Sequence, residues 1–400
     1  MSLLEKLCDE KAWAGFAQYR ASHGNITKKE QAQLDEFISL KRYLPLARSL
    51  DFSLPLKREI NKSGSHKKRV IYTFGDDETW VLKMLAWLLY KYDGAFCKGC
   101  YSFRQHSGAH TAMNDVVRTP RLNEKWVLKL DLHNYFNSMP SQLLAREFEK
   151  VITDDAPLLD FLSRFFTLDK AICGDSVVIE NRGAMAGVPL SAFCANLYLS
   201  DLDRRFEEMG AAYFRYSDDI LVLADTHQQA QEYFDLIRSH IERKGLALND
   251  EKFSLTPPHS AWEFLGFKYN CGQIDLADAS VRKMKAKIKR KAAKLLRWRC
   301  KRGLDGDRAA RAMIKIFDRK FYGQDSEHDL TWSRWYFPVL TCDKGLHAID
   351  EYLVQNIRYL YTGRHYKGNY RITYAHIKSL GCKSLVNEFY KFRKSRDTTH

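Results

Sequence analysis

The chain has 400 residues, of which 45% are hydrophobic and 13% aromatic, so it can bury the cores of two or three packed subdomains. This composition excludes an intrinsically disordered chain. A formal net charge of +15 favours a polyanionic partner, with nucleic acid ahead of an anionic membrane surface, and the alternative is a charge that only improves solubility.

The first residues show a helical pattern, with Leu34, Phe37 and Ile38 at helical spacing, and we expect a helical extension over residues 1–55. Residues 61–69, NKSGSHKKR, then form a basic Gly/Ser loop that leads into a predicted strand at Val70–Thr73. From about residue 70 to 270 the chain mixes short β runs with helices.

Cysteine usage and hydropathy bear on where the protein resides. Nine scattered cysteines form an odd set without the spacing of a disulfide framework, and no secretory signal precedes them, so we expect a cytoplasmic protein. Cys97 and Cys100 lack a second ligand pair at zinc-site spacing. The most apolar stretch, Val81–Tyr90, contains Lys83 and is shorter than the about 20 residues that span a bilayer, so no membrane association is expected.

One predicted strand of the central region ends on an acid. In KWVLKLDLHNYF, residues 125–136, an apolar β pattern at Val127, Leu128 and Leu130 stops at Asp131. Taken alone, this aspartate is more typical of a helix N-cap than of a metal ligand.

Two further acids interrupt the stretch YFRYSDDILVLA, residues 213–224. Asp218 and Asp219 lie between runs that are suited to buried strands, where an unpaired carboxylate is costly. The pair therefore needs solvent, a cationic partner or a metal. Two other adjacent pairs need none, because Asp76 and Asp77 open a predicted helix and residues 154–155 sit in a polar turn.

Together the two segments indicate a metal site. Asp131 at a strand end and the Asp218 pair at a hairpin tip, on neighbouring strands, can converge on two Mg²⁺ ions about 3.5 to 4 Å apart, as in the phosphoryl transfer of polymerases. Consecutive strand residues point to opposite faces, so Asp218 and Asp219 are inequivalent unless the turn distorts the backbone. We expect Asp131 and Asp218 as principal ligands and Asp219 as a supporting one.

The composition changes after residue 270. Between Val281 and Arg302 every charged residue is Lys or Arg, and an apolar stripe at helical spacing predicts a helix with one buried and one basic face. Lys287, Arg290 and Lys294 are the expected phosphate contacts, and a merely solvated face is the alternative. Farther along the chain, aromatic residues interleave with cations. Within this region, residues 358–371 are the better candidates for contact with RNA.

These residues resemble the motifs of bacterial reverse transcriptases of the retron, group II intron and defence-associated (unknown-group, Abi-like) assembly. The similarity covers residues 55–270, with motifs in the expected order: the basic loop ending in Lys68 and Arg69, YSFRQHSGAH (101–110), DLHNYF (131–136), GAMAGVPLSAFCANLYLSDLD (183–203), YSDD (216–219), GLALNDEK (245–252) and FLGF (264–267).

The resemblance implies an α+β fold, a right-hand polymerase with fingers, an antiparallel-sheet palm and a helical basic thumb. Fingers and palm are expected at 56–270 and the thumb with the C-terminal region at 271–400. It implies an RNA-directed DNA polymerase. By this resemblance, Arg69 would contact the triphosphate, and Arg104 would contact template or nucleotide. Phe136, at the strand end, would exclude a 2′ hydroxyl, and Gly187 would lie near the nascent pair. Lys252 would donate a proton, and the segment around Gly266 would be the primer grip.

The Gly-rich turn departs from the family pattern. Many relatives carry Pro-Gln before the glycine and Pro after the serine, whereas this chain has Met185-Ala186 before Gly187 and Ala192 after Ser191. These departures favour the defence-associated branch. The expected partners are dNTPs, the DNA product and an RNA template, for which a dedicated non-coding RNA is one option. A second copy of the chain or a second protein of an antiphage system is also expected. The alternatives are an RNA-templated RNA polymerase or primase, and a catalytically inactive RNA-binding scaffold.

Overall fold

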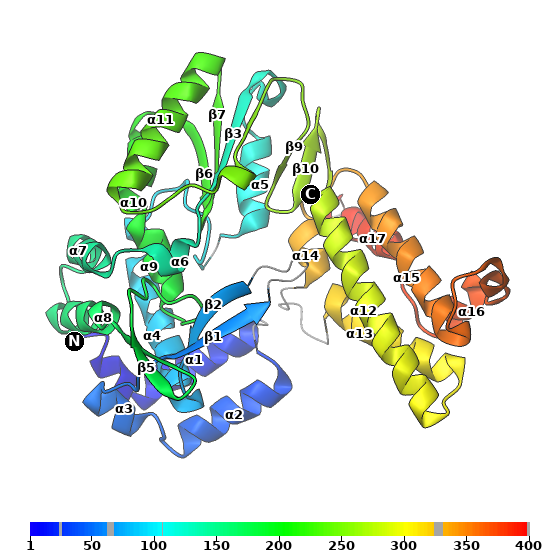
Figure 1. Cartoon of the computed structure of the whole chain (residues 1–400), viewed down its shortest axis with the longest axis horizontal. Helices are drawn as coiled ribbons and strands as arrows, with labels where there is room; N and C mark the ends of the chain where they lie inside the picture. The colour runs from blue at the N-terminus through cyan, green and yellow to red at the C-terminus, as the bar shows by residue number, and fades with distance from the viewer. Residues whose placement is uncertain (24–25, 62–67, 106, 324–330, 398–400) are drawn as a thin grey trace. The chain divides into compact units, whose positions relative to one another are not determined.

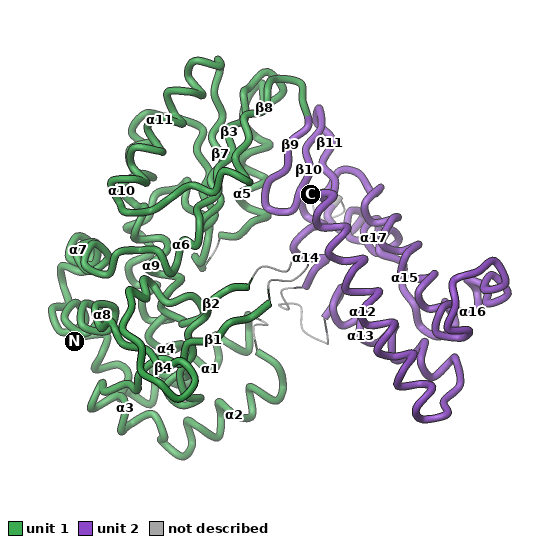
Figure 2. Tube along the Cα trace, viewed as in Figure 1, with its two compact units in different colours: residues 1–260 green, residues 261–400 purple. Residues whose placement is uncertain are grey.

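A computed structural model describes residues 1–23, 26–61, 68–105, 107–323 and 331–397 of the chain. The described residues divide into two compact units, residues 1–260 and residues 261–400, which Figure 2 distinguishes by colour. Each unit is considered by itself. No helix in the described ranges has both the length and the apolar content to cross a bilayer.

The first unit begins with helices that pack into its main core. They are η1 (Glu5–Cys8), α1 (Glu10–Ser22), α2 (Lys28–Ser39), α3 (Leu44–Ser49) and, after the first strands, α4 (Asp76–Leu88) and η2 (Leu89–Ala95). Asp9 caps α1, and Thr27 with Glu30 forms a capping box on α2. Trp13 stacks on Tyr43 at 4.8 Å between ring centroids. One continuous core joins this predicted helical extension to the sheet that follows.

A four-stranded sheet of order β2-β1-β4-β5 lies in the region of the first unit where the fingers are expected. Its strands are β1 (Leu56–Asn61), β2 (Lys68–Thr73), β4 (Lys170–Cys173) and β5 (Ser176–Ile179). The strand predicted at Val70–Thr73 is confirmed as part of β2, which pairs antiparallel with β1. Of the predicted basic loop, residues 62–67 lie outside the described residues.

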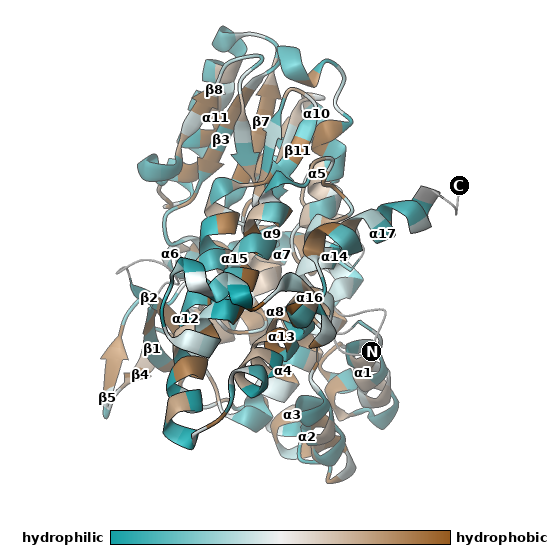
Figure 3. Ribbon diagram, turned by 90° about the vertical axis from the view of Figure 1, so that its right-hand side faces the viewer, coloured by the Kyte–Doolittle hydropathy of each residue, from teal (hydrophilic) through white to brown (hydrophobic). Residues whose placement is uncertain are grey.

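The second sheet, of order β6-β7-β3-β8, is antiparallel throughout, as expected for the palm. Its strands are β3 (Trp126–Asp131), β6 (Ala212–Tyr216), β7 (Asp219–Ala224) and β8 (Ser254–Thr256). Residues 220–224 of β7 are all buried, and Figure 3 shows this strand as hydrophobic. Helices on the sheet explain this continuous apolar run, because α11 (His227–Arg243) packs on β3 and β7, while α5 (Ala109–Val117) and α10 (Ser200–Glu208) pack on β6 (Figure 1).

The other helices of this unit lie between the strands of the two sheets along the chain. They are η3 (Leu122–Glu124), α6 (Tyr135–Ser138), α7 (Ser141–Val151), α8 (Ala156–Thr167), α9 (Ser191–Tyr198) and η4 (Asp250–Lys252). The predicted helix start at Asp76 is confirmed in α4. Asp155, expected in a polar turn, is a buried N-cap whose side chain accepts hydrogen bonds from the backbone of Leu158 and Leu3.

The second unit opens with an antiparallel sheet of order β11-β10-β9 and continues as helices. Its elements are β9 (Trp262–Phe264), β10 (Phe267–Asn270), β11 (Gln273–Leu276), α12 (Asp278–Arg302), α13 (Gly306–Tyr322), α14 (Trp332–Tyr336), α15 (Lys344–Thr362), η5 (Lys367–Arg371), α16 (Tyr374–Ser379) and α17 (Leu385–Asp397). The domain boundary predicted at residue 270 therefore lies inside the second unit, at the end of β10. The predicted basic helix is confirmed, with Met284, Ile288, Ala292 and Leu295 buried along its stripe.

Gly183 is required by the way the Gly-rich turn crosses α6. Its φ is +54°, and an added Cβ would lie 2.4 Å from the Phe136 carbonyl oxygen. Gly174 offers a matched control, because its φ is +62° and a Cβ there would meet nothing within 4 Å. Both positions carry the same left-handed strain, so any difference between them reports the backbone clash.

We expect Gly183→Ala to lower the free energy of unfolding by about 2 kcal/mol or more beyond the loss caused by Gly174→Ala. Urea unfolding followed by circular dichroism measures both variants. Equal losses would contradict this close approach of the turn to α6.

Candidate active site

The ends of β3 and β7 bring three carboxylates together. The strands pair antiparallel with Asp131 directly opposite Asp219, so these two side chains share one face of the sheet. Asp218 lies in the two-residue turn between β6 and β7. Its carbonyl oxygen accepts a hydrogen bond of 3.2 Å from the Leu132 backbone, which ties the turn to the end of β3. The predicted convergence of the two segments is confirmed.

The turn is distorted in the way that the adjacent acids require. Ser217 has a φ of +60°, a left-handed value that is uncommon for a residue with a side chain. Its backbone N–H donates to Ser102 Oγ at 2.9 Å, and the Ser102 hydroxyl donates to Asn196 Oδ1 at 2.8 Å. These buried contacts hold Asp218 and Asp219 at different positions relative to Asp131.

The fully buried side chain of Arg215 contacts the backbone of this turn. Arg215 forms an ion pair with Asp203 of α10, with a distance of 2.7 Å from Nε to Oδ1. Its guanidinium also donates to the carbonyl oxygens of Ala195, Asn196 and Ser217, at 3.1, 3.0 and 3.3 Å. Burial by itself lowers the pKa of Arg215, but Asp203 raises it well above the usual value, so the side chain stays charged.

Sequence reasoning missed this pair, although a signal was present. Arg215 interrupts the apolar strand between Phe214 and Tyr216 as abruptly as the aspartates that follow it. Its partner, Asp203, lies twelve positions earlier on a helix, so only the tertiary structure identifies it.

The surroundings of the Asp218 pair raise the pKa of both its carboxyls. Burial is the largest cause of the raised pKa for both residues of the pair. The negative charge of Asp131 raises the pKa of Asp218 further. Burial together with the charges of Asp218 and Asp131 raises the pKa of Asp219 to about 6. Among the described residues, neither carboxylate of the pair has a cation within ion-pair distance, and a backbone hydrogen bond only partly offsets the rise for Asp218. The nearby cations do not offset the burial and the mutual repulsion of these carboxylates.

Asp131 is the one acid of the three with a cationic partner. Lys252 Nζ lies 2.5 Å from Asp131 Oδ2, and Asn249 Nδ2 donates to Oδ1 at 3.0 Å. Although burial opposes it, the contact with Asp131 and the charges of Asp219 and Asp218 raise the pKa of Lys252, which is therefore protonated. The lysine predicted from the GLALNDEK segment does reach the acids.

The donor set fits a hard divalent cation, whose ligands in proteins are oxygens. Asp131, Asp218 and Asp219 would hold it, and it would supply the charge that Asp218 and Asp219 lack. Among the described residues, no three acidic, His or Cys side chains are grouped as a complete site for an ion. Lys252 now neutralises one member of the set.

The fingers strand β2 approaches the site through the Gly-rich turn. The Tyr72 backbone N–H donates to the Ala186 carbonyl oxygen at 2.8 Å, and a Cβ on Gly187 would lie 3.0 Å from the Tyr72 carbonyl oxygen. Gly187 thus permits the approach of β2, which carries Arg69. The Arg69 side chain is exposed, and its charge stabilises the ionised form of Asp218.

Phe136 lies differently from expectation, and Arg104 contacts its own loop. Phe136 was expected at a strand end, but β3 stops at Asp131 and Phe136 lies in the short helix α6, because the chain turns at Asn134, whose φ is +48°. The Arg104 guanidinium donates to the carbonyl oxygens of Cys97, Cys100 and Asp93, at 2.9, 3.2 and 3.1 Å. It therefore holds its own loop, and its role toward template or nucleotide stays a prediction.

The remaining predicted residues belong to the second unit. Lys287, Arg290 and Lys294 are exposed along α12. Gly266 lies in the turn between β9 and β10 with a φ of +87°, and a Cβ there would lie 2.6 Å from the Tyr336 hydroxyl, so the glycine allows the turn to pack on α14. Its contact with nucleic acid stays a prediction.

Comparisons with known proteins agree with this geometry. The model of the family "Reverse transcriptase (RNA-dependent DNA polymerase)" matches residues 60–269. Together with the antiparallel palm sheet, this match confirms the expected fold class, an α+β right-hand polymerase.

Two curated relatives and one solved structure are similar to the chain. The "Retron Ec86 reverse transcriptase" of Escherichia coli is 24% identical over 174 residues, which are 42% of this chain and 50% of the relative. The "Retron Ec48 reverse transcriptase" of the same organism is 25% identical over 240 residues, 57% and 54% of the two chains. The chain spans about half the length of these relatives. An apo telomerase from Candida tropicalis matches with a TM-score of 0.45 and 12% identity over 56% of this chain and 55% of its own.

The raised pKa of Asp219 predicts that this carboxylate destabilises the folded protein. Its folded pKa of about 6 exceeds the usual 3.8, so without divalent cations stability is lost as the pH rises from about 4 through 6. We expect Asp219→Asn to be more stable than wild type at pH 7.5 in EDTA, by at most about 3 kcal/mol, and equally stable near pH 4. Thermal unfolding across this pH range measures the difference.

Asp225, just after the same strand, serves as the control with the opposite sign. Hydrogen bonding to Lys125 lowers its pKa, so Asp225→Asn should lose a little stability at pH 7.5 and match wild type only in strong acid. An Asp219→Asn protein that is less stable than wild type at pH 7.5 would contradict the repulsion between the three acids.

Proposed function

The chain belongs to the reverse transcriptase (RNA-dependent DNA polymerase) family, and we propose that it extends a primer with deoxynucleotides on an RNA template. The observation that carries this proposal is the register of the palm sheet, which sets Asp131 opposite Asp219 and places Asp218 in the adjoining turn. An inactive scaffold would have no need to keep three mutually repelling acids at one sheet end.

We propose that the acids hold two Mg²⁺ ions, with Asp131 and Asp218 as principal ligands and Asp219 in support. When bound, the ions would supply the Lewis acidity that assists attack by the primer 3′ hydroxyl and stabilises the leaving pyrophosphate. Loading requires Asp131 to exchange its contact with Lys252 for a metal. Lys252, 45% exposed, would then be free to donate its proton to the pyrophosphate.

Two further side chains would bind the incoming nucleotide. Arg69 is exposed on β2 within the electrostatic range of Asp218, and its planar guanidinium suits a triphosphate. Phe136 is half-buried in α6, with its ring centroid 6.4 Å from that of Phe103. A close-packed ring there leaves no room for a ribose 2′ hydroxyl.

The basic face of α12 is the proposed contact with the template–primer backbone. Lys287, Arg290 and Lys294 have no ion-pair partner in the described part of the chain. Burial of its stem and the nearby charges of Lys320 and Arg290 lower the pKa of Lys287, as expected where cations gather without acids. A phosphate backbone would relieve this repulsion.

The biological setting follows from the sequence departures and from the relatives. Two relatives are retron reverse transcriptases, and the altered Gly-rich turn favours a defence-associated enzyme. We propose a cytoplasmic role in antiphage defence, with a dedicated non-coding RNA as template and a second copy or second protein as partner. Sequencing the nucleic acid that copurifies with the protein, before and after nuclease digestion, tests the identity of the template.

Asp218→Asn should abolish incorporation by several orders of magnitude, because it removes a ligand charge and preserves the shape of the side chain. Its fold should persist, since the ionised carboxylate is itself unfavourable. Primer extension with Mg²⁺ is the measurement. Asp76→Asn, at the first turn of α4, is the control and should keep nearly full activity. Equal losses in both variants would indicate a general stability effect.

Phe136→Ala should relax sugar discrimination, so that ribonucleotides enter alongside deoxynucleotides. The measurement is the ratio of kcat/KM for a matched dNTP and rNTP in wild type and variant. A wild type that accepts both sugars equally would instead select an RNA-templated RNA polymerase or primase. An unfolded variant would show that the ring serves only the core.

Replacing Lys287, Arg290 and Lys294 together with Gln should weaken binding of a primer–template duplex of any sequence and flatten the slope of log affinity against log salt by close to one unit per lost contact. A triple variant of exposed lysines in the first unit, Lys11, Lys28 and Lys29, removes the same charge and should keep the slope. An unchanged slope in the α12 variant would mean that this face is only solvated.

A further inference from the structure

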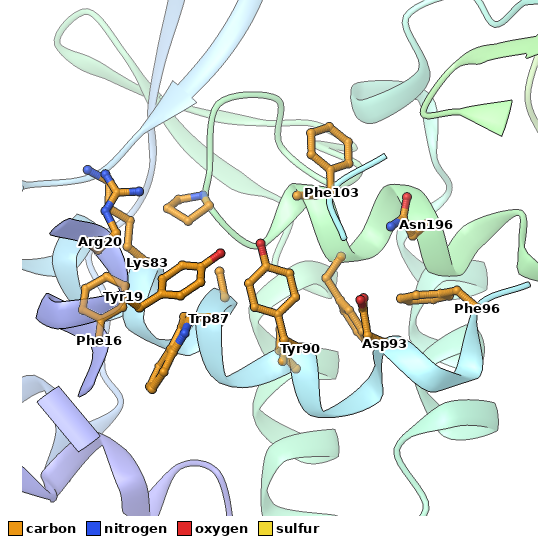
Figure 4. A pocket seen from close by; sticks show the side chains of 15 residues that line it. Phe16, Tyr19, Arg20, Lys83, Trp87, Tyr90, Asp93, Phe96, Phe103 and Asn196 are labelled. Atoms are coloured by element: carbon orange, nitrogen blue, oxygen red, sulfur yellow. The ribbon is translucent and has the colours of Figure 1, made fainter. Parts of the chain in front are cut away.

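Two features of the first unit lie outside the active site, a cavity and a free strand edge. Rings from α1, α4 and η2 line the cavity, which has a volume of about 200 Å³ (Figure 4). Arg20 and Lys83 at one end lie within the electrostatic range of Glu30, and Asp93 lines the same space. The charged groups of the cavity therefore have partners within the chain. The strand edge, in contrast, presents backbone groups that have no partner among the described residues.

The free edge belongs to β5, the last strand of the sheet β2-β1-β4-β5, whose four strands are labelled in Figure 3. Among the described strands, β5 pairs only with β4. Its Val177 and Ile179 side chains are 58% and 72% exposed, and Leu168, two residues before β4, is 44% exposed. Proteins usually protect such an edge with lysine, proline or a bulge, and β5 has none of these.

The unpaired hydrogen-bonding groups of this edge belong to the same two residues. The Glu180 backbone N–H donates to the Asp169 carbonyl oxygen at 2.7 Å, so this pair is a hydrogen-bonded pair of the β4–β5 ladder. Hydrogen-bonded and non-hydrogen-bonded pairs alternate along an antiparallel ladder, and Val177 and Ile179 therefore form pairs of the second kind. Their N–H and C=O groups point away from β4, and no described residue outside the hairpin bonds to them.

The charge of the edge favours a protein partner over nucleic acid. The whole chain carries a net charge of +15, yet residues 171–181 contain no lysine or arginine, and their charged residues are Asp175 and Glu180. Glu180 already forms an ion pair with Lys57. A phosphate backbone would find no cation along this segment, whereas an extended apolar edge suits the addition of another β-strand.

The strand is complementary to a second copy of itself. An antiparallel pairing centred on Val178 sets Val177 of each copy opposite Ile179 of the other. This register uses the outward N–H and C=O groups of both residues, and each of the two pairs exchanges two hydrogen bonds. Directly opposed residues share a face of the sheet, so the exposed apolar side chains of the two copies would pack on one another.

We propose that two copies of the chain associate through β5, so that the sheets of their first units continue into each other about a two-fold axis. The register brings no like charges together, because Asp175 lies opposite Asn181 and Glu180 lies opposite Ser176. The inference selects the second copy from the two partners proposed above, and it does not require the polymerase function.

Sedimentation velocity of the full chain, treated with nuclease and freed of nucleic acid at high salt, tests the association. A strand pair of this length is smaller than a standard interface, so we expect a reversible dimer with a dissociation constant on the order of 10 µM. Ile179→Lys places a charge on the edge and should raise this constant about tenfold or more. Leu40→Lys makes the same change at a 63% exposed leucine after α2 and should leave it unchanged.

Two further variants test the backbone pairing and its register. Val177→Pro keeps an apolar side chain but removes an outward N–H, which an edge strand tolerates, so the monomer should fold and dimerise more weakly. Val178→Cys sets a thiol opposite its own copy, where Cα atoms about 4.5 Å apart permit a disulfide. A mild oxidant should cross-link this variant. The wild type carries an exposed Cys173 in the same hairpin, far from the axis, and should stay uncross-linked.

A wild type that remains monomeric up to about 100 µM would overturn the proposal, because even a small interface gives measurable association at that concentration. So would an Ile179→Lys protein that dimerises as tightly as wild type, or dimers that form only when RNA is added. Circular dichroism shows whether each variant has kept its fold.

Primer extension separates this proposal from the polymerase function. β5 carries none of the residues proposed to bind metal or nucleotide, so Ile179→Lys should incorporate nucleotides as wild type does. A wild type that incorporates none would contradict the polymerase function, while the sedimentation results would still decide whether the chain dimerises through β5.

Discussion

The buried ion pair of Arg215 and Asp203 is the interaction on which the site depends most directly. Both side chains are fully buried, and the arginine also holds the carbonyl oxygens of Ala195, Asn196 and Ser217. It thereby links α9, α10 and the turn that carries Asp218. A buried pair of this kind adds little net stability, but loss of one partner leaves an uncompensated charge that costs about 3 to 5 kcal/mol. The pair fixes the position of the turn more than it stabilises the fold.

Unlike this ion pair, the carboxylates of Asp218 and Asp219 have surroundings that disfavour their charge. Asp218 and Asp219 are held partly buried beside Asp131, where burial and mutual repulsion disfavour their charged forms. Lys252 compensates for a single carboxylate. The protein tolerates this repulsion because the rest of the first unit, with one continuous core from Leu3 to Leu246, holds the strands in register. A preorganised group of acids short of positive charge is what a site for divalent cations requires.

Small residues and one amide decide how the fingers strand meets the palm. Asn137 of α6 donates to the Val70 carbonyl oxygen at 3.1 Å and accepts from the Ala186 N–H at 2.8 Å, so it bridges β2 and the Gly-rich turn. Gly183 and Gly187 allow the backbones to come this close. The position of Arg69 near the acids is therefore a consequence of backbone packing around the turn.

The sequence by itself determined the strands that carry the acids, the basic helix and the three acids, because these depend on local patterns: an apolar run that ends on Asp131 at 127–131, a period of 3.6 at 281–302 and charges within an apolar run at 218–219. It did not identify Asp203 as the partner of Arg215, the α6 helix around Phe136 or the loop contacts of Arg104. Each of these depends on atoms that are distant in sequence or on a left-handed turn at Asn134, and local periodicity carries no information about either. Only the tertiary structure could decide them, because the partners of a buried polar group are set by which backbones and side chains surround it after packing.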